Sequence, residues 1–394
     1  MAKPATTEWN DRKIWESSGF LRFLTDHDID ASDLLSSTTK RDLLRYIRLK
    51  QVNNSGKVED DRLQLIAADL ARKATRKVSA EFEPKGCPWL PGFYSLPVSA
   101  PLASVDLYKK GEVYGIDISS GYAVKLLNLE PGEHVLDLCC APGAKLAMVA
   151  DLLHLCGSVT GVDCSRSRLG ACKQLVHKYG LVESQSESEQ WRCRLFHADG
   201  STFSIGPKTE CMHLDGVELL FDTNEIASRS SKSRMRKRKN KSARSRDAKR
   251  QKVLEHDSTL YDKVLVDAEC THDGSIRHLQ RLNSTSRWNE YVRDHLNLSE
   301  IERILKLQRA LIRNGFSLLR SGGLLIYSTC SLSFKQNEEI VSELLQDEPL
   351  ALLDPIVAGN DVPCREGKLP GTLRFIPSQN TSGLFIARIR KINQ

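Results

Sequence analysis

The stretch VLDLCCAPGAK, residues 135–145, joins a short apolar run to a helical segment through a loop of small residues. Two adjacent cysteines, Cys139 and Cys140, begin the loop. The 11 cysteines of the chain are scattered and none form a CxxC pair, so their pattern does not indicate a zinc site. The N-terminus lacks an apolar segment, so we expect no secretory signal and therefore reduced thiols. We interpret the stretch as a loop that holds a ligand, without a metal.

Apolar runs alternate with helical stretches from about residue 133 onward. The strand candidates are HVLDLC, SVTGVD, WRCRLFHAD, DKVLVDAEC and GGLLIYSTC, and the first two are followed by the helix candidates KLAMVADLLHL and SRSRLGACKQLVHKYG. This alternation predicts an α/β fold, a parallel sheet with helices on both faces. SFKQNEEIVSELLQ, residues 333–346, begins with a Ser-x-x-Gln capping box and predicts a helix that ends before Pro349. LRFIP and GLFIARI predict a closing antiparallel pair.

We expect two domains, residues 1–95 and residues 96–394. The first is predicted to be small and mixed α/β, with a strand at RYIRLKQ and a helix through apolar residues at helical spacing, Leu63, Ile66, Ala67 and Leu70. PWLPGFYSLP, residues 88–97, is predicted to be irregular. The second domain contains a long break in the pattern at about residues 204–258, which we expect to be a disordered insertion. No window of 18 apolar residues occurs, so no membrane span is expected.

The positive charge of the chain is concentrated in one segment. The formal net charge is +7, and the run at residues 229–252 holds 13 Lys and Arg against one Asp, a net +12 that leaves −5 for the rest. The run has no apolar periodicity, so it is predicted to be disordered when free. Its composition favours phosphate contact and nuclear import, with a plain solvated linker as the alternative.

Carboxylates follow the predicted strands where those strands end, and we expect them to meet in one crevice, as ligand-binding residues do in open parallel sheets. An acid after the second strand suits a ribose diol, one after the third suits an adenine amino group, and Gly143 can take a positive φ in the loop. The layout therefore fits S-adenosylmethionine, and without a GxGxxG motif it disfavours NAD. Alternatively, any doubly wound domain can carry acids at its strand ends. The acids are Asp137, Asp163, Asp199 and Asp267.

Cys270 and Cys330 follow the fourth and fifth strands, beside Asp267 and two hydroxyls. A free cysteine is usually a small buried hydrophobic residue, but a polar strand end favours the reactive thiolate. Methylation at carbon 5 of a pyrimidine needs a reactive thiolate with a carboxyl group beside it. A thiolate adds to carbon 6 and makes carbon 5 nucleophilic, while a neighbouring carboxyl stabilises the charge that builds on the ring.

These stretches, in this order, resemble the Nol/Nop/Sun (RsmB-like) family of RNA cytosine-carbon-5 methyltransferases. VLDLCCAPGAK is similar to the family's DLCAAPGGKT loop, and GEVYGIDISSGYAV, residues 111–124, to the segment that precedes it. GVDCSRSRL and HADG resemble the ribose-side and adenine-side strand ends. DAEC resembles the family's Asp-Ala-Pro-Cys, and STCSLSFKQNEEIV resembles its Thr-Cys-Ser and following helix. The similarity covers roughly residues 85–390.

The resemblance implies a Rossmann-like class I methyltransferase sheet, S-adenosylmethionine as cofactor and a structured RNA, tRNA or rRNA, as partner. By this resemblance Cys330 is the nucleophile, Cys270 assists release of the covalent adduct, and Asp267 contacts the target base. The cofactor-binding residues that it implies are Cys139, Cys140, Ala141, Pro142, Gly143, Ala144, Lys145, Asp163, Arg168, Asp199 and Asp267.

The chain departs from the family pattern at a few positions. Glu269 stands where the family has proline, and it is expected to raise the pKa of Cys270 or to compete for a hydrogen bond. Ala144 and Leu146 replace a glycine and a threonine. After Cys270 the chain reads THDGSIRH where the family often has Ser-Gly and a basic stretch, for which His272, Asp273 and Arg277 are substitutes. Ser382-Gly-Leu-Phe replaces Asp-Gly-Phe-Phe.

Two other functions are compatible with the sequence. Glu269 and the altered loop are compatible with an RNA-binding assembly factor whose methyltransferase site is impaired. A methyltransferase that acts on protein or a small molecule is the other alternative, which the basic run and the RYIRLKQ segment disfavour. We favour the active enzyme, because Cys270, Cys330 and Asp267 are all present. We expect a monomer in the nucleus or nucleolus.

Deletion of residues 229–252 is predicted to weaken RNA binding and to flatten its salt dependence, because fewer phosphate contacts release fewer counterions. The measurement is the slope of log Kd against log salt for the full chain and the deletion variant. An unchanged slope would assign the run to targeting or to a linker.

Overall fold

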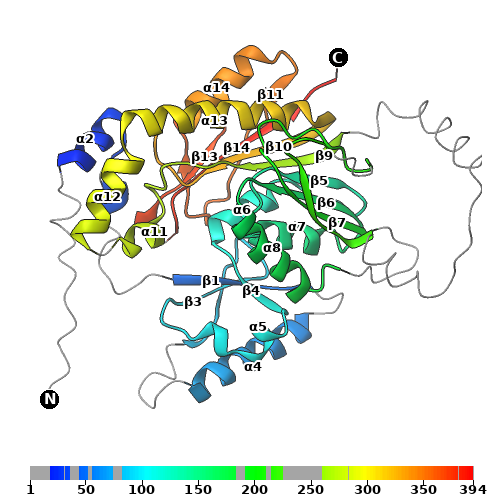
Figure 1. Ribbon diagram of the computed structural model, residues 1–394. Helices are drawn as coiled ribbons and strands as arrows, with labels where there is room; N and C mark the ends of the chain where they lie inside the picture. The colour runs from blue at the N-terminus through cyan, green and yellow to red at the C-terminus, as the bar shows by residue number, and fades with distance from the viewer. Residues whose placement is uncertain are drawn as a thin grey trace, which may run out of the picture.

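The chain is seen here in a computed structural model (Figure 1). The described residues are 18–30, 32–35, 44–51, 56–73, 82–182, 191–209, 214–224, 260–282, 284–379 and 381–393. The basic run at residues 229–252 lies outside them, so its predicted disorder stays a prediction.

A ten-stranded sheet forms the centre of the fold, in the order β12-β13-β14-β10-β9-β5-β6-β7-β8, with β11 paired to β14. Its five inner strands are parallel, as predicted: β10 (Leu319–Thr329), β9 (Tyr261–Asp267), β5 (His134–Asp137), β6 (Gly157–Asp163) and β7 (Trp191–His197). The predicted C-terminal pair is confirmed, since β13 (Leu373–Phe375) and β14 (Leu384–Lys391) are antiparallel. β14 lies between β10 and β13. The remaining strands are β8 (Glu218–Asp222), β11 (Ala351–Leu353) and β12 (Arg365–Glu366).

Helices cover both faces of this sheet, because its inner strands are apolar on both sides (Figure 1). One face packs against α6 (Ile118–Lys125), α7 (Ala144–Leu152) and α8 (Arg166–Lys178). The other packs against α13 (Leu298–Ser317) and α14 (Glu338–Asp347). The predicted α/β class, with helices on both faces, is confirmed.

The helix α14 begins later than the capping box predicts. It starts at Glu338, and no side chain caps its first turn. Gln336 is turned inward, where its side chain bonds the backbone N–H and the hydroxyl of Thr271. The prediction of a capping box at Ser333 is wrong because these polar side chains bind other loops instead of the helix end.

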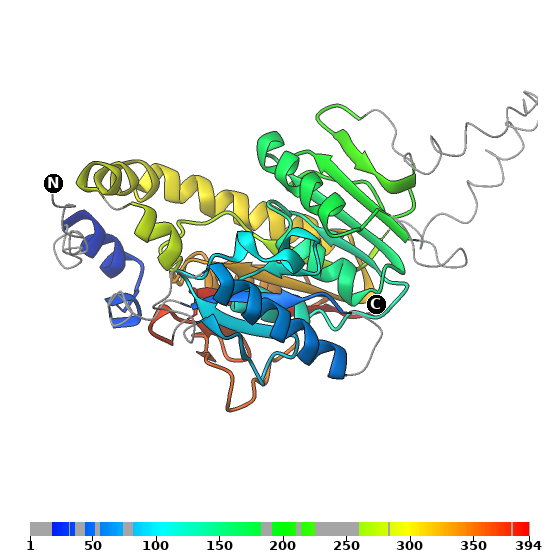
Figure 2. The same cartoon turned by 90° about the horizontal axis from the view of Figure 1, so that it is seen from below.

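A small antiparallel sheet packs beside the α6–α8 layer and faces the viewer in Figure 2. Its order is β2-β3-β1-β4, with α4 (Gly56–Lys73) and α5 (Asp106–Lys109) packed on it. The predicted strand RYIRLKQ is β1 (Leu44–Leu49), and β2 is Lys85–Gly86. The expected boundary at residue 95 falls inside β3 (Phe93–Pro97), and β4 (Val113–Gly115) lies beyond it. The stretch at residues 88–97 is therefore only partly irregular.

The first described helices belong to a different part of the molecule. α2 (Ser18–Asp26) and α3 (Ser32–Leu35) share a core with α11 (Ile276–Arg281) and α12 (Thr285–His295). Figure 2 shows α2 beside α12, away from the small sheet. Residues 1–95 therefore contribute to two places, since their apolar faces are buried by segments far along the chain.

The expected insertion at residues 204–258 is partly structured. β8 pairs antiparallel with β7 and forms one edge of the main sheet. Two nitrogens of the Arg192 guanidinium on β7 donate to the carboxylate of Asp222 at the end of β8, and the shorter of the two contacts is 2.6 Å. The sequence did not predict this strand because it lies outside the alternating pattern.

A buried ion pair joins the small sheet to the main domain. The Arg48 guanidinium on β1 donates to the Asp151 carboxylate on α7 at 2.6 Å, and both side chains are at most 4% exposed. Asp151 also accepts the backbone N–H of Gln51, and Arg48 donates to the Tyr114 hydroxyl at 2.8 Å. Each charge therefore has a partner, and the two units are fixed against each other.

Replacing Asp151 with alanine leaves the Arg48 guanidinium buried without its carboxylate. We expect the free energy of unfolding in urea to fall by about 3–5 kcal/mol. The control Asp106→Ala removes the exposed partner of Lys109 and should change it by less than about 1 kcal/mol. A similarly small loss for Asp151→Ala would mean that the ion pair is not needed to join the units.

Candidate active site

A cleft of about 300 Å³ opens beyond the carboxyl ends of the parallel strands, where the sequence predicts a crevice. It also includes residues that sequence analysis did not assign to the site, among them Asp117, Ser275 and Leu311. The predicted site residues that line it are Cys139, Ala141, Lys145, Asp163, Arg168, Asp199, Asp267 and Cys330. The structure therefore brings together side chains from all five parallel strand ends.

Cys140 lies in the core, away from the cleft. Its side chain is 3% exposed and packs near Cys172, while its backbone N–H donates to the Val162 carbonyl at 3.0 Å. The hydrogen bond to Cys172, together with burial, holds the pKa of the Cys140 thiol well above its usual range. Of Cys140, only the backbone therefore belongs to the predicted cofactor loop, and its side chain packs in the core.

The rest of the loop has the shape that small residues permit. Gly143 has φ +106°, and a Cβ atom there would lie 2.7 Å from the Cys172 sulfur, so only glycine fits. Pro142 and Ala144 do not line the cleft, and Ala144 is the first residue of α7. Its substitution for the family's glycine therefore needs no left-handed backbone. Leu146 is fully buried in the core.

Asp163 and Asp199 occupy the two strand ends expected to bind a nucleoside. Asp163 accepts backbone N–H groups from Ala141 at 3.2 Å and Ser165 at 2.8 Å, so it is fixed in place. Asp199 is exposed and accepts the backbone N–H of Ser201 at 2.8 Å. Arg168 donates to the Ala141 carbonyl and braces the loop. These carboxylates retain free lone pairs that face a cleft with apolar walls, which suits a nucleoside carrying a positive sulfonium.

The remaining acid of the series is buried beneath the loop. Asp137 is 1% exposed, and one of its oxygens accepts the Cys139 N–H at 3.2 Å. Its other oxygen has no hydrogen-bond partner among the described residues. Burial raises the pKa of Asp137 to about 7, so a proton can satisfy that oxygen near neutral pH.

Lys145, predicted as a residue of the cofactor loop, also forms an ion pair with Asp267. The ammonium lies 2.6 Å from one Asp267 oxygen, and the Ser328 hydroxyl donates to the other at 2.6 Å. Burial alone would lower the pKa of Lys145, but the Asp267 carboxylate outweighs burial and raises it. Ser328 lies at the predicted end of its strand, but the sequence did not show that its hydroxyl holds Asp267 in position.

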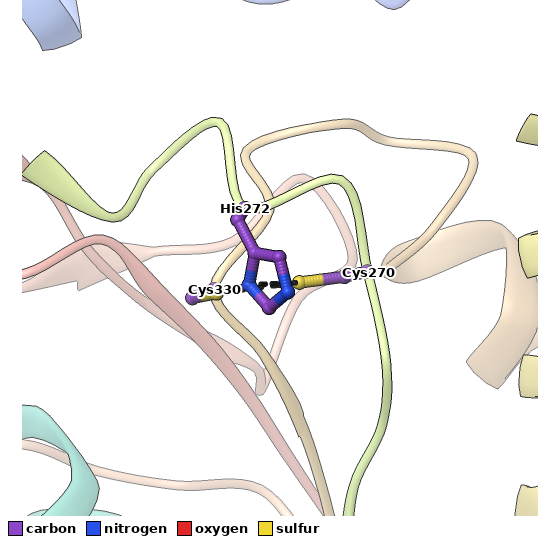
Figure 3. A group of neighbouring side chains, drawn as sticks. All are labelled: Cys270, His272 and Cys330. Carbon is purple, nitrogen blue, oxygen red and sulfur yellow. Dashed lines mark hydrogen bonds between the residues drawn. The ribbon is translucent and has the colours of Figure 1, made fainter. Parts of the chain in front are cut away.

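Cys270 and Cys330 lie side by side, and His272 lies against both (Figure 3). The two sulfurs are 3.3 Å apart, and His272 Nδ1 is 3.0 Å from the Cys330 sulfur and 3.8 Å from the Cys270 sulfur. Cys330 faces the cleft, whereas Cys270 is buried behind it. The Cys270 sulfur, the Cys330 sulfur and one nitrogen of His272 all lie within 4.8 Å of one another.

The two thiols share one negative charge. Burial would raise the pKa of Cys270, but the hydrogen bond with Cys330 and the His272 imidazole outweigh it and lower that pKa to about 6. The same hydrogen bond, together with burial, holds the pKa of Cys330 well above its usual range. The Cys270 charge raises the pKa of His272 to about 9. The cluster thus holds an imidazolium beside a thiolate at neutral pH.

Buried polar groups tie the two cysteine loops together. Asp273 accepts the Thr271 hydroxyl and the Leu332 N–H, at 2.8 Å for the latter. Gly274 donates its N–H to the Cys330 carbonyl at 2.9 Å, and a Cβ atom there would lie 2.6 Å from that oxygen. The sulfur positions are therefore set by hydrogen bonds around them.

Glu269 lines the cleft and forms an ion pair with Arg303 on α13 at 2.6 Å. The pKa of Cys270 is lowered, so the expected rise is not found at that thiol. The Glu269 charge instead contributes to the raised pKa of His272. Arg277 donates to the Leu44 carbonyl at 2.8 Å, outside the cleft.

Within the part of the chain that the structure describes, no helix is both long and apolar enough to cross a membrane.

Known proteins share this sequence pattern and fold. A family described as 16S rRNA methyltransferase RsmB/F matches residues 124–197 and 223–390. The chain is 34% identical over 300 residues to the ribosomal RNA small subunit methyltransferase F of Erwinia tasmaniensis, covering 74% of this chain and 48% of that protein. It is 28% identical over 239 residues to the human tRNA (cytosine(72)-C(5))-methyltransferase NSUN6, covering 61% and 38%.

The fold has a counterpart in the crystal structure of NSun6 from Pyrococcus horikoshii with SFG. The TM-score is 0.59 at 16% identity, and the match covers 97% of both chains. The chain spans about half the length of the curated relatives that it matches first. Because the family match extends over more than half of its residues and includes both cysteine loops, the chain belongs to the RsmB/F (NOL1/NOP2/Sun) family.

Proposed function

We propose that this protein transfers a methyl group from S-adenosylmethionine to carbon 5 of a cytosine in RNA, through a covalent cysteine adduct. The observation that carries the proposal is the pair of sulfurs 3.3 Å apart, with Cys330 facing the cleft that Asp267 also lines. A nucleophile and a carboxylate that line one cleft, with a second thiol next to the nucleophile, are the groups that this chemistry needs.

The cleft residues fit the cofactor. Asp163 and Asp199 offer acceptors for a ribose diol and an adenine amino group, and Leu138 and Ala141 offer apolar wall. The bound cofactor supplies an electrophilic methyl group on a sulfonium. Lys145 is engaged by Asp267, so it does not repel that positive charge as a free ammonium would.

The roles of the protein groups in the reaction follow from their positions. The Cys330 thiolate adds to carbon 6 of the cytosine, and the electron pair of the carbon 5–carbon 6 double bond moves to carbon 5, which becomes nucleophilic towards the methyl group that the bound cofactor would supply. Asp267, held by Lys145 and Ser328, accepts a hydrogen bond from the exocyclic amine of the cytosine and so orients the ring for attack.

Release of the product requires loss of the carbon 5 proton. The electron pair of that C–H bond restores the double bond, the carbon 6–sulfur bond breaks, and its electron pair returns to Cys330. The proton leaves to solvent. Cys270, next to the Cys330 sulfur, is the group placed to assist this elimination.

The RNA is proposed to be a ribosomal or transfer RNA, since the relatives include an rRNA small subunit methyltransferase and a tRNA methyltransferase. The basic run at residues 229–252 supports the further proposal of a nuclear or nucleolar location. An assembly factor without activity loses part of its support, because Glu269 is paired with Arg303 and the pKa of Cys270 is lowered with Glu269 present.

The test of this function is covalent trapping. We incubate Cys270→Ala and Cys330→Ala separately with cofactor and total cellular RNA, and we look for a protein–RNA adduct that survives denaturation. Cys270→Ala should accumulate the adduct, because formation is intact and release is slowed, and Cys330→Ala should form none. Cys156→Ala is the matched control and should resemble the wild type. If neither variant traps RNA while the wild type binds cofactor, the result favours an RNA-binding assembly factor over an active enzyme.

Lys145→Met tests the positioning of Asp267. Without the ammonium the carboxylate loses one of its two fixed partners, so kcat should fall by about 10- to 100-fold while the KM for cofactor changes less. The control Lys306→Met replaces an exposed lysine on α13 and should leave both constants unchanged. A rise in the KM for cofactor with an unchanged kcat would instead make Lys145 a cofactor-binding residue.

A further inference from the structure

His272 occupies a backbone position that suits glycine. Its φ is +58°, in the left-handed region that non-glycine residues rarely adopt. The related family often has Ser-Gly where this chain has Thr271-His272, so a residue with less strain is available at this position. A side chain held at such a position is a sign of function when it also meets reactive groups.

The imidazole meets both sulfurs and lines the cleft. Figure 3 shows the ring pointing between Cys270 and Cys330, with contacts of 3.8 and 3.0 Å from Nδ1. Lys145 and Arg303, two other cations that lie near these loops, are ion-paired with Asp267 and Glu269. Among the described side chains, His272 is the cationic group that contacts both sulfurs.

The surroundings of His272 favour its charged form. Asp273 and Glu269 add negative charge near His272 and so favour its protonated form. The neighbouring His278 ring is 5.1 Å away and does not carry a competing positive charge. Burial and the positive charge of His272 lower the pKa of His278 to about 4, so His278 is neutral at physiological pH. The titratable groups that face His272 are Cys270, Cys330, Asp273, Glu269 and His278.

We propose that His272 is a catalytic residue that, as an imidazolium, keeps one thiolate on the Cys270–Cys330 pair and holds that charge on Cys330 when the pyrimidine is attacked. The inference rests on the proposed function, which it deepens by adding a charged partner to the nucleophile. In the step, the Cys330 proton moves to the Cys270 thiolate across 3.3 Å; in Cys270→Ala that proton goes to solvent, and the His272 imidazolium still holds the charge on Cys330. The freed Cys330 electron pair forms the bond to carbon 6, and His272 keeps its proton throughout.

The experiment needs neither RNA nor cofactor. We measure the rate at which iodoacetamide alkylates Cys330 between pH 5.5 and 9.5, by mass spectrometry of the Cys330 peptide from the reduced, full-length protein. Peptide-level measurement separates Cys330 from the other cysteines, and Cys270 is buried behind it. The variants are His272→Gly, which relieves the left-handed backbone, His272→Asn, which tolerates it, and His278→Ala as the matched control.

In the wild type the rate should reach half of its plateau near pH 6, because the pair holds one thiolate above that pH. In His272→Gly and His272→Asn the midpoint should move up towards the ordinary thiol value of about 8.5, and the rate at pH 6.5 should fall about tenfold. Added imidazole should restore part of the rate in His272→Gly. His278→Ala should keep the wild-type midpoint.

The outcomes separate this inference from the proposed function. A wild-type midpoint in both His272 variants, with circular dichroism showing that they are folded, overturns the inference even if the wild type methylates RNA. A midpoint that moves equally in His278→Ala also overturns it, since ring packing would then be the cause. A shifted midpoint in the His272 variants alone, in a protein that traps no RNA, supports the thiolate–imidazolium pair and counts against the methyltransferase.

Discussion

Five parallel strands lie side by side, so all of their carboxyl ends reach the same edge of the sheet. This constraint places every reactive group of the cleft. The strands are apolar throughout because helices cover both faces, and their first polar positions therefore come where the strands end. Asp163, Asp267 and Cys330 are far apart in sequence, yet the parallel register lines them up around a single cleft.

The two cysteine loops depend on a second layer of buried polar side chains. Gln336 bonds Thr271, Asn337 bonds the Thr329 hydroxyl and the Ser331 carbonyl, and Glu338 forms a fully buried ion pair with Arg374. Such groups are costly when unpaired and rigid when every partner is present. The segment after Cys330 therefore has the residue types of a helix start but supports the site instead.

The sequence predicted the parts of the molecule that depend on local pattern. The parallel strands, the C-terminal pair and the gathering of Asp267 and Cys330 at one edge follow from apolar periodicity and strand polarity. The positions of β4 and β8 did not follow, because both lie outside the alternating apolar pattern and are defined by their partners across the sheets. The ion pair of Glu269 is formed with Arg303, 34 residues away, and a sequence read position by position does not show that contact.

The position of β14 in the sheet determines when the sheet can be completed during synthesis. Among the described residues β14 comes last in sequence of all strands, yet it lies between β10 and β13 and pairs with the strand that leads to Cys330. A ribosome releases the chain from its N-terminus, so the edge of β10 stays unpaired until residues 384–391 have emerged. An open strand edge is prone to wrong pairing. The nucleophile therefore reaches its final setting only after residues 384–391 have left the ribosome, and until then the nascent chain exposes an unpaired strand edge beside an unfinished catalytic loop.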